Sequence, residues 1–565
     1  MPTTRKAIRD HTATAGRAAT RIAGKKKTTA KKPAATKKPV DRKKGTPAKK
    51  RSTAAKRAST KTSAKPTVIV VNMIPRSLSG EDNQDSEPTI TVSPANPLNI
   101  VASAFTPDPA SGAFAPIYVS TDGGMSWSLN SIVPSSVAQG SMTADITVAF
   151  GAGNRLYAGI IRLPYQGDLT RLNILRSDDF QSATPMKVLI DRTGKGVDQP
   201  YVQALTVASG PDKGKDRLYV GDNDFNAPGK TATIDQSLDA AKATPAFKSV
   251  RLESRSTSGQ DGPPVRPCPH RDGTVYAVFH SWRTYDDRTG KGTADIVVVR
   301  DDKGATGSSP YSALVDPGDG KVGQRVAQGT QFNFNGYLGL QRTGGDVAIA
   351  VDPRDSAKVY VAFNDDNGSD YTLHLRRSTN RGAAWSADLR TISNALNPAI
   401  AVNNAGVVGV VFQQLVGTGA AQRWDTKFIS SADGVNWSSI TLATTPANNP
   451  AKKFDPYLGD YEHLTAVGKD FYGVFSASNV PNKANFPNGV KFQRNANFAT
   501  NTLLDVDNST PVHPSIDPFF FKITGLGFLS TEPPGEDARW LLPSRAGRLP
   551  DVARAWRRRQ QAHQC

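Results

Sequence analysis

The chain contains little cysteine and no long apolar run. Its 565 residues include only two cysteines, Cys268 and Cys565, whose wide spacing does not indicate a disulfide framework. Because no run of about 18 apolar residues occurs, we expect no membrane span. No apolar stretch of about 7–15 residues follows the basic N-terminus, so we expect no secretory signal peptide. The compartment stays open between the bacterial cytoplasm and export by another route.

The sequence also lacks common catalytic and metal-binding motifs. It has no Gly-x-x-x-x-Gly-Lys-Ser/Thr phosphate loop, no His-Glu-x-x-His motif and no cysteine pair spaced for a metal. The run from Asn364 to Asp370 has the residue types of a Ca²⁺ loop, and Asp222 to Asn226 is a second such segment. The first opens with Asn and lacks the closing Glu, which excludes an EF-hand. We predict no cofactor, with Ca²⁺ the one cation that these acids suit, and the sequence assigns no metal ligand.

The positive charge of the protein lies in one segment. The formal net charge is +20. Residues 1–66 carry 22 Lys and Arg against only Asp10 and Asp41, whereas the rest of the chain is balanced. This Lys-, Ala-, Thr- and Pro-rich segment has too few apolar residues to offset its ordering entropy, so we predict a disordered tail. Its composition resembles that of histone H1-like bacterial tails. It indicates either non-specific binding of nucleic acid or other polyanions, or a solubilising extension.

Three short stretches repeat one pattern, in which Ser is followed by Asp or Asn, then Gly, then Trp. The stretches run over residues 120–127, 378–385 and 431–437. In such a turn the Asp or Asn side chain accepts backbone N–H bonds, and Gly supplies a positive φ. The Trp is a large apolar plate able to wedge between neighbouring sheets. The pattern residues are Ser120, Asp122, Gly124, Trp127, Ser378, Asn380, Gly382, Trp385, Asp433, Gly434 and Trp437.

This pattern resembles the Asp box, or BNR repeat, of the sialidase-like β-propellers. The resemblance covers roughly residues 85–500 and implies that each box joins the two outer strands of a propeller blade, on the rim away from the ligand site. True sialidases carry an Arg-Ile-Pro motif, and this chain has Met73-Ile-Pro-Arg76 instead, with Arg on the wrong side. Arg162, Arg266 and Arg283 lie near inner strands and could supply a carboxylate clamp. No catalytic residue is carried over from the family.

A unit of about 50 residues recurs between residues 67 and 525 and predicts an all-β propeller. Seven units open at Glu87, Asp145, Asp198, Gly262, Asp346, Asn397 and Asp460. True sialidases have six blades, so six or seven four-stranded blades are consistent with the pattern, and we favour seven. Residues 67–71 should close the ring by pairing with the last blade. The predicted domains are therefore a tail (1–66), a propeller (67–530) and an Arg-rich C-terminal extension (531–565).

The starts of the inner strands should gather acids at one mouth of the central channel. The candidate channel-mouth residues are Glu87, Asp145, Asp198, Asp346, Asp460 and Glu462, with Asn397 and Asp261 nearby in the pattern. Either each acid caps a neighbouring loop, or their crowding raises some carboxyl pKa values or recruits a cation. Since strand neighbours point to opposite faces, we expect Asp460 and Glu462 to face the channel and Tyr461 to pack sideways.

Two functions fit these features. The first is a binding or interaction propeller that presents its channel mouth to a glycan or protein. The alternative is a sialidase-like glycoside hydrolase acting on a polysaccharide or glycoconjugate, with acids at the mouth. Two carboxylates about 5–10 Å apart beside aromatic side chains would favour hydrolysis. The absent Arg-Ile-Pro motif favours binding, so whether the protein is an enzyme stays open, and no catalytic residue is assigned.

Overall fold

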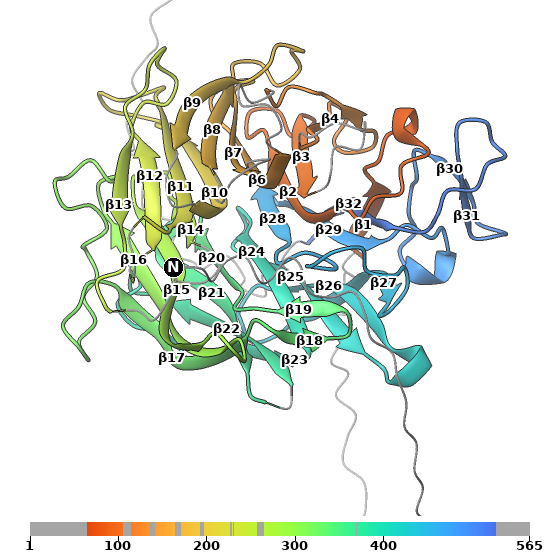
Figure 1. Ribbon diagram of the computed structural model, residues 1–565. Helices are drawn as coiled ribbons and strands as arrows, with labels where there is room; N and C mark the ends of the chain where they lie inside the picture. The colour runs from red at the N-terminus through yellow and green to blue at the C-terminus, as the bar shows by residue number, and fades with distance from the viewer. Residues whose placement is uncertain are drawn as a thin grey trace, which may run out of the picture. The chain divides into compact units, whose positions relative to one another are not determined.

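A computed structural model describes most of residues 65–526 (Figure 1). The described ranges are 65–105, 115–134, 142–163, 171–192, 197–226, 229, 231–256, 265–368 and 370–526. The predicted tail, apart from residues 65 and 66, and the predicted C-terminal extension lie outside these ranges, as does Asp261.

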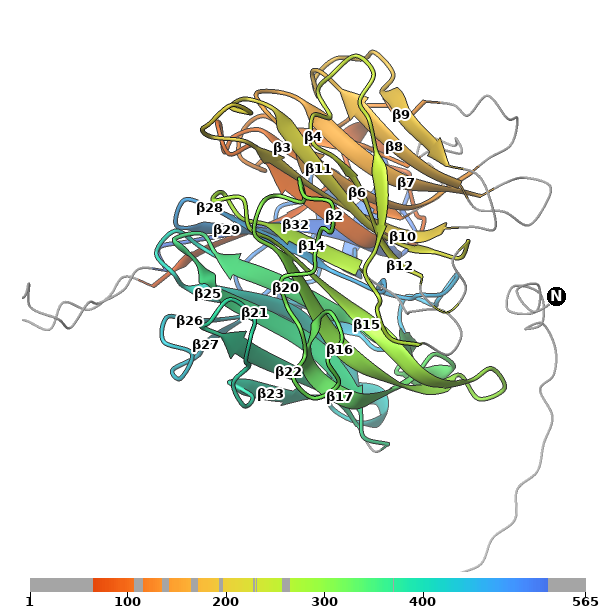
Figure 2. The same cartoon turned by 90° about the vertical axis from the view of Figure 1, so that its left-hand side faces the viewer.

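The chain folds into a β-propeller with seven four-stranded blades, which confirms the favoured blade count. Within each of the first six blades the strands pair antiparallel in sequence order. The inner strands lie near the centre of the ring and the fourth strands at its periphery (Figure 1), and Figure 2 shows the sheets from the side. The first three blades are β2 (Ser86–Val92), β3 (Ile100–Phe105), β4 (Tyr118–Ser120) and β5 (Ser128–Leu129); β6 (Met142–Phe150), β7 (Leu156–Leu163), β8 (Arg171–Ser177) and β9 (Lys187–Arg192); and β10 (Val197–Thr206), β11 (Asp216–Asp224), β12 (Ala232–Ser237) and β13 (Lys248–Arg251).

The next three blades follow the same plan. They are β14 (Val265–Pro269), β15 (Val275–Asp286), β16 (Lys291–Asp301) and β17 (Gln324–Asn333); β20 (Val347–Asp352), β21 (Asp355–Asp366), β22 (Tyr371–Ser378) and β23 (Arg390–Ser393); and β24 (Ala395–Val402), β25 (Val408–Val416), β26 (Arg423–Ser431) and β27 (Ser438–Pro446).

The seventh blade is built from both ends of the described chain. Its strand order is β28 (His463–Val467), β29 (Asp470–Ser478), β32 (Ile516–Thr524) and β1 (Thr67–Asn72). Strand β1 pairs antiparallel with β32, from Thr67 opposite Thr524 to Asn72 opposite Phe519. The prediction that residues 67–71 close the ring is therefore confirmed. Closure pairs an edge of β32 that would otherwise be exposed.

Apolar residues on both faces of each blade hold the ring together. One cluster of buried hydrophobic side chains fills each of the seven interfaces between neighbouring blades. The cluster at the seam between the seventh and first blades contains Met73 and Ile74, both fully buried. The Met-Ile-Pro sequence that stands where sialidases have Arg-Ile-Pro is thus part of the core.

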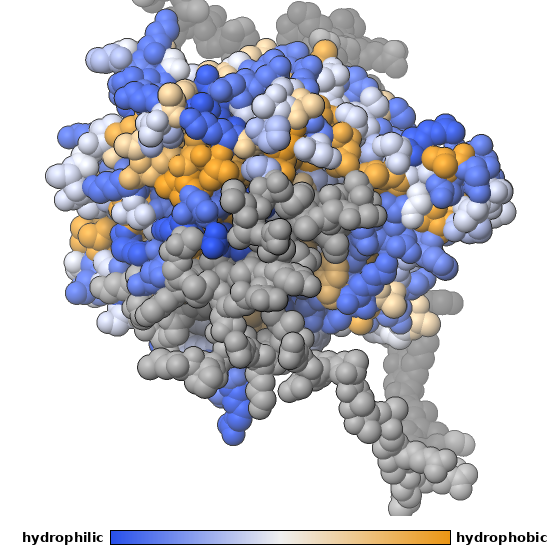
Figure 3. Space-filling model, turned by 45° about the horizontal axis from the view of Figure 1, so that its top comes forward, coloured by the Kyte–Doolittle hydropathy of each residue, from blue (hydrophilic) through white to orange (hydrophobic). Residues whose placement is uncertain are grey.

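Two hairpins and three short turns were not predicted. The hairpin of β18 (Gly336–Leu338) and β19 (Gln341–Thr343) lies between the fourth and fifth blades in sequence, and that of β30 (Asn495–Asn497) and β31 (Thr502–Leu504) interrupts the seventh. The helical elements of the described residues are the 3-10 turns η1 (Arg76–Leu78), η2 (Gly419–Ala421) and η3 (Lys483–Asn485). None of these short turns could serve as a membrane-spanning helix. In the view of Figure 3 the described surface is mostly hydrophilic, with separate apolar patches.

The three Ser-Asp/Asn-Gly-Trp turns each join the third and fourth strands of a blade, in the first, fifth and sixth blades. In the first, Ser120 Oγ donates to Asp122 Oδ1 (2.8 Å), which also accepts from the Met125 and Ser126 N–H groups (both 2.9 Å). The Trp127 ring lies 5.4 Å from that of Phe520 in the preceding blade. The topology puts these turns on the face opposite the inner-strand starts, as expected for turns that serve structure.

Candidate channel-mouth site

Inner strands bulge where they begin. In the first, third and sixth blades the register shifts at the bulge, and a residue with positive φ stands directly before proline. These residues are Glu87 (φ 53°), Gln199 (φ 50°) and Asn397 (φ 56°). Non-glycine residues pay conformational energy in this region, and bulges commonly re-aim side chains beside functional sites. The bulges turn the strand ends so that polar groups gather at the mouth.

Each blade contributes one polar residue to this mouth. In order around the ring they are Glu87, Asp145, Asp198, Arg266, Asp346, Asn397 and Asp460. The Asp460 N–H donates to Glu87 Oε1 (3.0 Å), and the Asn397 N–H donates to Asp346 Oδ2 (2.9 Å). Residues far apart in sequence thus form one cluster, which includes five of the six candidate acids.

Glu87 and Asp145 form a directly hydrogen-bonded carboxyl pair. Burial is the main cause that raises the pKa of both groups, and the charges of Asp145 and Asp460 raise the pKa of Glu87 further, to well above its usual value. Two adjacent carboxyl groups cannot both ionise cheaply, so the pair favours a state in which the two groups share a proton.

Asp198 and Asp346 are also poised to carry a proton. Burial raises the pKa of each to about 7; Asp145 adds to the effect at Asp198 and Asp460 adds to it at Asp346. Such values place both acids near the midpoint of their titration in neutral solution, which is the range useful for general acid–base chemistry.

Two arginines balance part of this negative charge. Arg342, on β19, donates from Nε to Asp460 Oδ1 (3.2 Å) and makes a second, close contact with Asp460 Oδ2. Although burial lowers the pKa of Arg342, the charge of Asp460 outweighs burial and raises it overall. Arg266 instead lies over the rings of Tyr201 (4.2 Å) and Tyr461 (5.1 Å), and burial lowers its pKa.

Gly459 allows the hairpin and the mouth to approach each other. Its carbonyl oxygen accepts from Gln341 Nε2 and from Asn397 Nδ2 (both 2.7 Å). Its φ is 101°, and an added Cβ would lie 2.6 Å from the Glu87 backbone nitrogen. A side chain at position 459 would therefore push the Asp460 loop away from Glu87.

A cavity of about 260 Å³ lies along the inner strands, and Tyr201, Arg266, Cys268, Glu462 and His463 are among its lining residues. The Ile90 N–H donates to His463 Nδ1 (3.2 Å), so Nε2 carries the proton and donates to the Tyr201 hydroxyl (3.0 Å). Burial lowers the pKa of His463 to about 3, so the imidazole is neutral.

Aromatic rings lie at the same end of the propeller. Phe105 ends β3, opposite Ser86 at the start of the inner strand, and its ring centroid is 5.7 Å from that of Phe454. Both rings are half-buried. Half-buried aromatic rings of this kind can stack on the apolar faces of sugars.

One expectation about residues 460–462 is wrong. Strand β28 begins only at His463, so strand alternation does not apply to the preceding residues. Tyr461 does not pack sideways, since its ring lies beneath Arg266 and the charges of Glu87 and Asp145 act on its phenol. Glu462 lines the cavity along the inner strands beside His463, in keeping with the expectation that it faces the channel, and burial raises its pKa well above the usual value.

Other candidates have structural partners. Of the clamp arginines, Arg162 donates to Asn173 (2.7 Å) and Arg283 pairs with Glu253 and Asp295, so neither forms a clamp with Arg266. In the two Ca²⁺-like segments, Asp222 pairs with Arg192 (2.8 Å), and Asp365 accepts from the Gln331 N–H (2.7 Å).

Arg342, Gln341 and Gly459 were missed in the sequence. The one local signal is Gly339, which has a positive φ (60°) in the turn between β18 and β19, but a turn residue does not say which surface a hairpin covers. Only the folded ring brings β19 to the Asp460 loop.

Comparisons with known proteins give only distant structural similarities. No protein-family model matches this sequence, and no curated protein is similar to it in sequence. Similar solved structures include an alpha-L-arabinanase of Penicillium chrysogenum complexed with arabinobiose, with 13% identity, 81% of this chain and 98% of that chain covered, and a TM-score of 0.38. An ulvan lyase of a new polysaccharide lyase family shows 11% identity, coverage of 70% and 92%, and a TM-score of 0.44. The comparisons do not show membership of the sialidase-like family.

Proposed function

We propose that the channel mouth is a glycan-binding site with glycoside hydrolase activity on a polysaccharide or glycoconjugate. The observation that supports this most is that one mouth contains two kinds of carboxyl group, one with a raised pKa and one paired with an arginine. Asp198 is an acid poised to hold a proton, and Asp460 is a carboxylate paired with Arg342. Glycoside hydrolysis needs this combination, one group to protonate the leaving oxygen and one charged carboxylate to act as nucleophile or base.

The roles follow from the surroundings of each group. Asp198 donates its proton to the glycosidic oxygen, and Asp460 acts at the anomeric carbon or on a water beside it. Arg342 holds the Asp460 carboxylate in place through two contacts. Phe105 and Phe454 offer faces on which sugar rings stack. The Tyr461 phenol, which makes no hydrogen bond among the described residues, is a second candidate nucleophile.

The test is reducing-sugar release from a panel of polysaccharides, measured together with glycan-array binding. Asp198→Asn and Asp460→Asn should each lower the rate about 10²–10⁴-fold while glycan binding persists. The matched control is Asp470→Asn at the β28–β29 turn on the opposite face, which should change neither. Wild-type activity should fall as pH rises above about 7, because Asp198 then loses its proton.

Two outcomes would contradict the hydrolase assignment. Binding of a glycan by the wild type without any release of reducing ends would favour the binding propeller instead. Equal activity of Asp198→Asn, Asp460→Asn and the control Asp470→Asn would show that the mouth acids do not take part in catalysis.

A further inference from the structure

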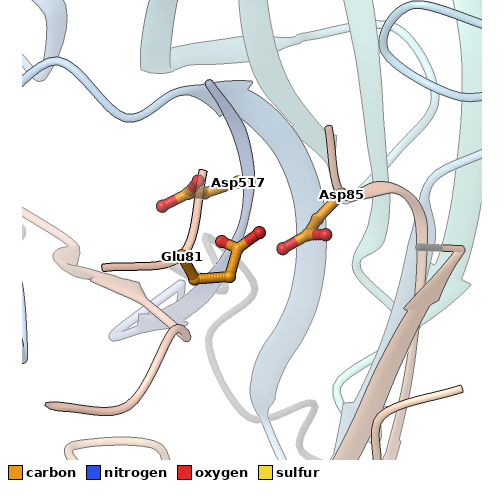
Figure 4. A group of neighbouring side chains, drawn as sticks. All are labelled: Glu81, Asp85 and Asp517. Atoms are coloured by element: carbon orange, nitrogen blue, oxygen red, sulfur yellow. The ribbon is translucent and has the colours of Figure 1, made fainter. Parts of the chain in front are cut away.

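A second group of acids lies at the seam where the ring closes. Glu81 and Asp85 belong to the segment that leads into β2, and Asp517 lies on β32 of the seventh blade (Figure 4). One carboxylate oxygen from each residue lies within 4.8 Å of those from the other two. All three side chains are buried, with exposed fractions of 8%, 0% and 0%.

Among the described residues, Arg494 is the cation in contact with this group of acids. It makes a close ion pair with Asp517 and donates from Nη1 to the Glu81 backbone oxygen (2.8 Å). Asn72 on β1 donates to Asp517 Oδ2 (2.7 Å). Three buried carboxylates this close together repel one another, and a bound proton or cation relieves that repulsion.

A buried hydroxyl group beside the acids gives an independent indication of a ligand. The Tyr118 hydroxyl is fully buried and makes no hydrogen bond to any described residue, and the charges of Asp85, Glu81 and Asp517 all act on it. Glu81 Oε2 also lacks a hydrogen-bond partner among the described residues. Buried polar groups are rarely left unsatisfied in native proteins, so these oxygens point to a missing ligand.

We propose that Glu81, Asp85 and Asp517 bind a divalent cation, Ca²⁺ by preference. Every donor is a hard oxygen, which suits Ca²⁺ and not the softer transition metals. The three carboxylates form the core of the site, and the Tyr118 hydroxyl, with water, is available for the remaining positions. This site is separate from the acids of the channel mouth and does not depend on the proposed activity.

The bound cation would stabilise the contact between the first and seventh blades, where the ring closes. Asp85 belongs to the approach to the first blade, Asp517 to the seventh, and Asn72, which holds Asp517, to the closing strand. The Asp85 N–H already donates to the Ile516 oxygen (2.7 Å) across this seam. The same segment enters β2 and carries Glu87 to the mouth, so binding would also fix the position of Glu87.

The experiment is calorimetric titration of the chelator-treated, full-length protein with Ca²⁺, together with thermal melting. We expect one Ca²⁺ per chain and a rise in Tm with Ca²⁺. Glu81→Gln and Asp85→Asn should abolish both the binding heat and the Tm response. Because Gln has the same shape as Glu, Glu81→Gln should fold and melt like the chelator-treated wild type.

The matched control is Asp198→Asn at the channel mouth, which should keep the full Ca²⁺ response. Absence of binding heat and of a Tm shift in the wild type would overturn the proposal and leave the seam acids with a shared proton instead. Loss of the response in Asp198→Asn with retention in Glu81→Gln would also overturn it, by placing the cation at the mouth.

Discussion

Asp198 couples the channel mouth to the stability of the fold. Its folded-state pKa of about 7 exceeds the ordinary value of 3.8, so the folded protein binds more protons here than the unfolded chain does. The contribution of this group is therefore fully present below about pH 4 and is lost as pH rises towards 7. At neutral pH the buried Asp198 therefore lowers the free energy of unfolding, and packing elsewhere in the propeller must compensate for this loss.

Asp198→Asn should remove this pH dependence. Relative to the wild type, the variant should gain free energy of unfolding between pH 4 and pH 8, by on the order of 2 kcal/mol after allowing for partial solvent access. The Asn side-chain oxygen can still accept from the Gln199 N–H, as Asp198 Oδ1 does (3.0 Å). Urea unfolding at several pH values measures the difference, and parallel profiles for the two proteins would contradict the elevated pKa.

For individual residues of the mouth and the seam, the sequence predicted residue types better than positions. The acids at inner-strand starts could be identified because each follows the same offset in its repeat. Tyr461 could not be placed, because its expected orientation depended on a strand that begins only at His463. Arg342 and the seam acids could not be found by repeat analysis, because they belong to segments that occur once in the chain.

The Ser-Asp/Asn-Gly-Trp turns differ in how deeply their tryptophan side chains are buried. Trp127 is 4% exposed and donates from Nε1 to the Gly124 oxygen (3.1 Å), whereas Trp385 is half-buried at the margin of its cluster. The sequence pattern alone gives the two tryptophans equal weight. The difference in burial arises from the packing of each tryptophan against the neighbouring blade.

Trp127→Ala should therefore cost about 3–5 kcal/mol of unfolding free energy, and Trp385→Ala about 1–3 kcal/mol. Both variants should keep glycan binding, since the turns lie on the face opposite the mouth. Chemical denaturation gives the stabilities and a glycan array gives the binding. An equal cost at both positions, or a loss of binding in a fully folded variant, would contradict this assignment.

Elements that repeat were predictable and elements that do not repeat were not. Alternating apolar residues and turn signals gave seven inner strands and the closing strand, because each satisfies the same packing requirement between blades. The β18–β19 hairpin carries Arg342, yet its three-residue strands show no apolar alternation that distinguishes them from loops.

For the whole molecule, the sequence composition changes abruptly between the basic tail and the ring. We expect removal of residues 1–64 to leave the melting temperature unchanged and to abolish DNA binding. The intact protein should bind DNA with an affinity that falls steeply as salt rises, because Lys and Arg release counterions from phosphates. Melting curves and a salt-dependent binding titration measure both effects.

The matched control extends the deletion to residue 72. That protein lacks β1 and leaves β32 as an open edge, so it should unfold at lower temperature or aggregate. Salt-independent DNA binding, or DNA binding retained after removal of residues 1–64, would contradict a role for the tail.

The seam also has a consequence for synthesis on the ribosome. Strand β1 is among the first parts of the ring to emerge, but its partner β32 begins only at Ile516. At roughly 5–20 residues per second, β1 waits roughly 20–90 s without its partner. The Asp460 N–H donates to Glu87 across the same seam, so a nascent or truncated chain that cannot close the ring holds no complete mouth. Activity should appear in one step, only after the last strand has left the exit tunnel.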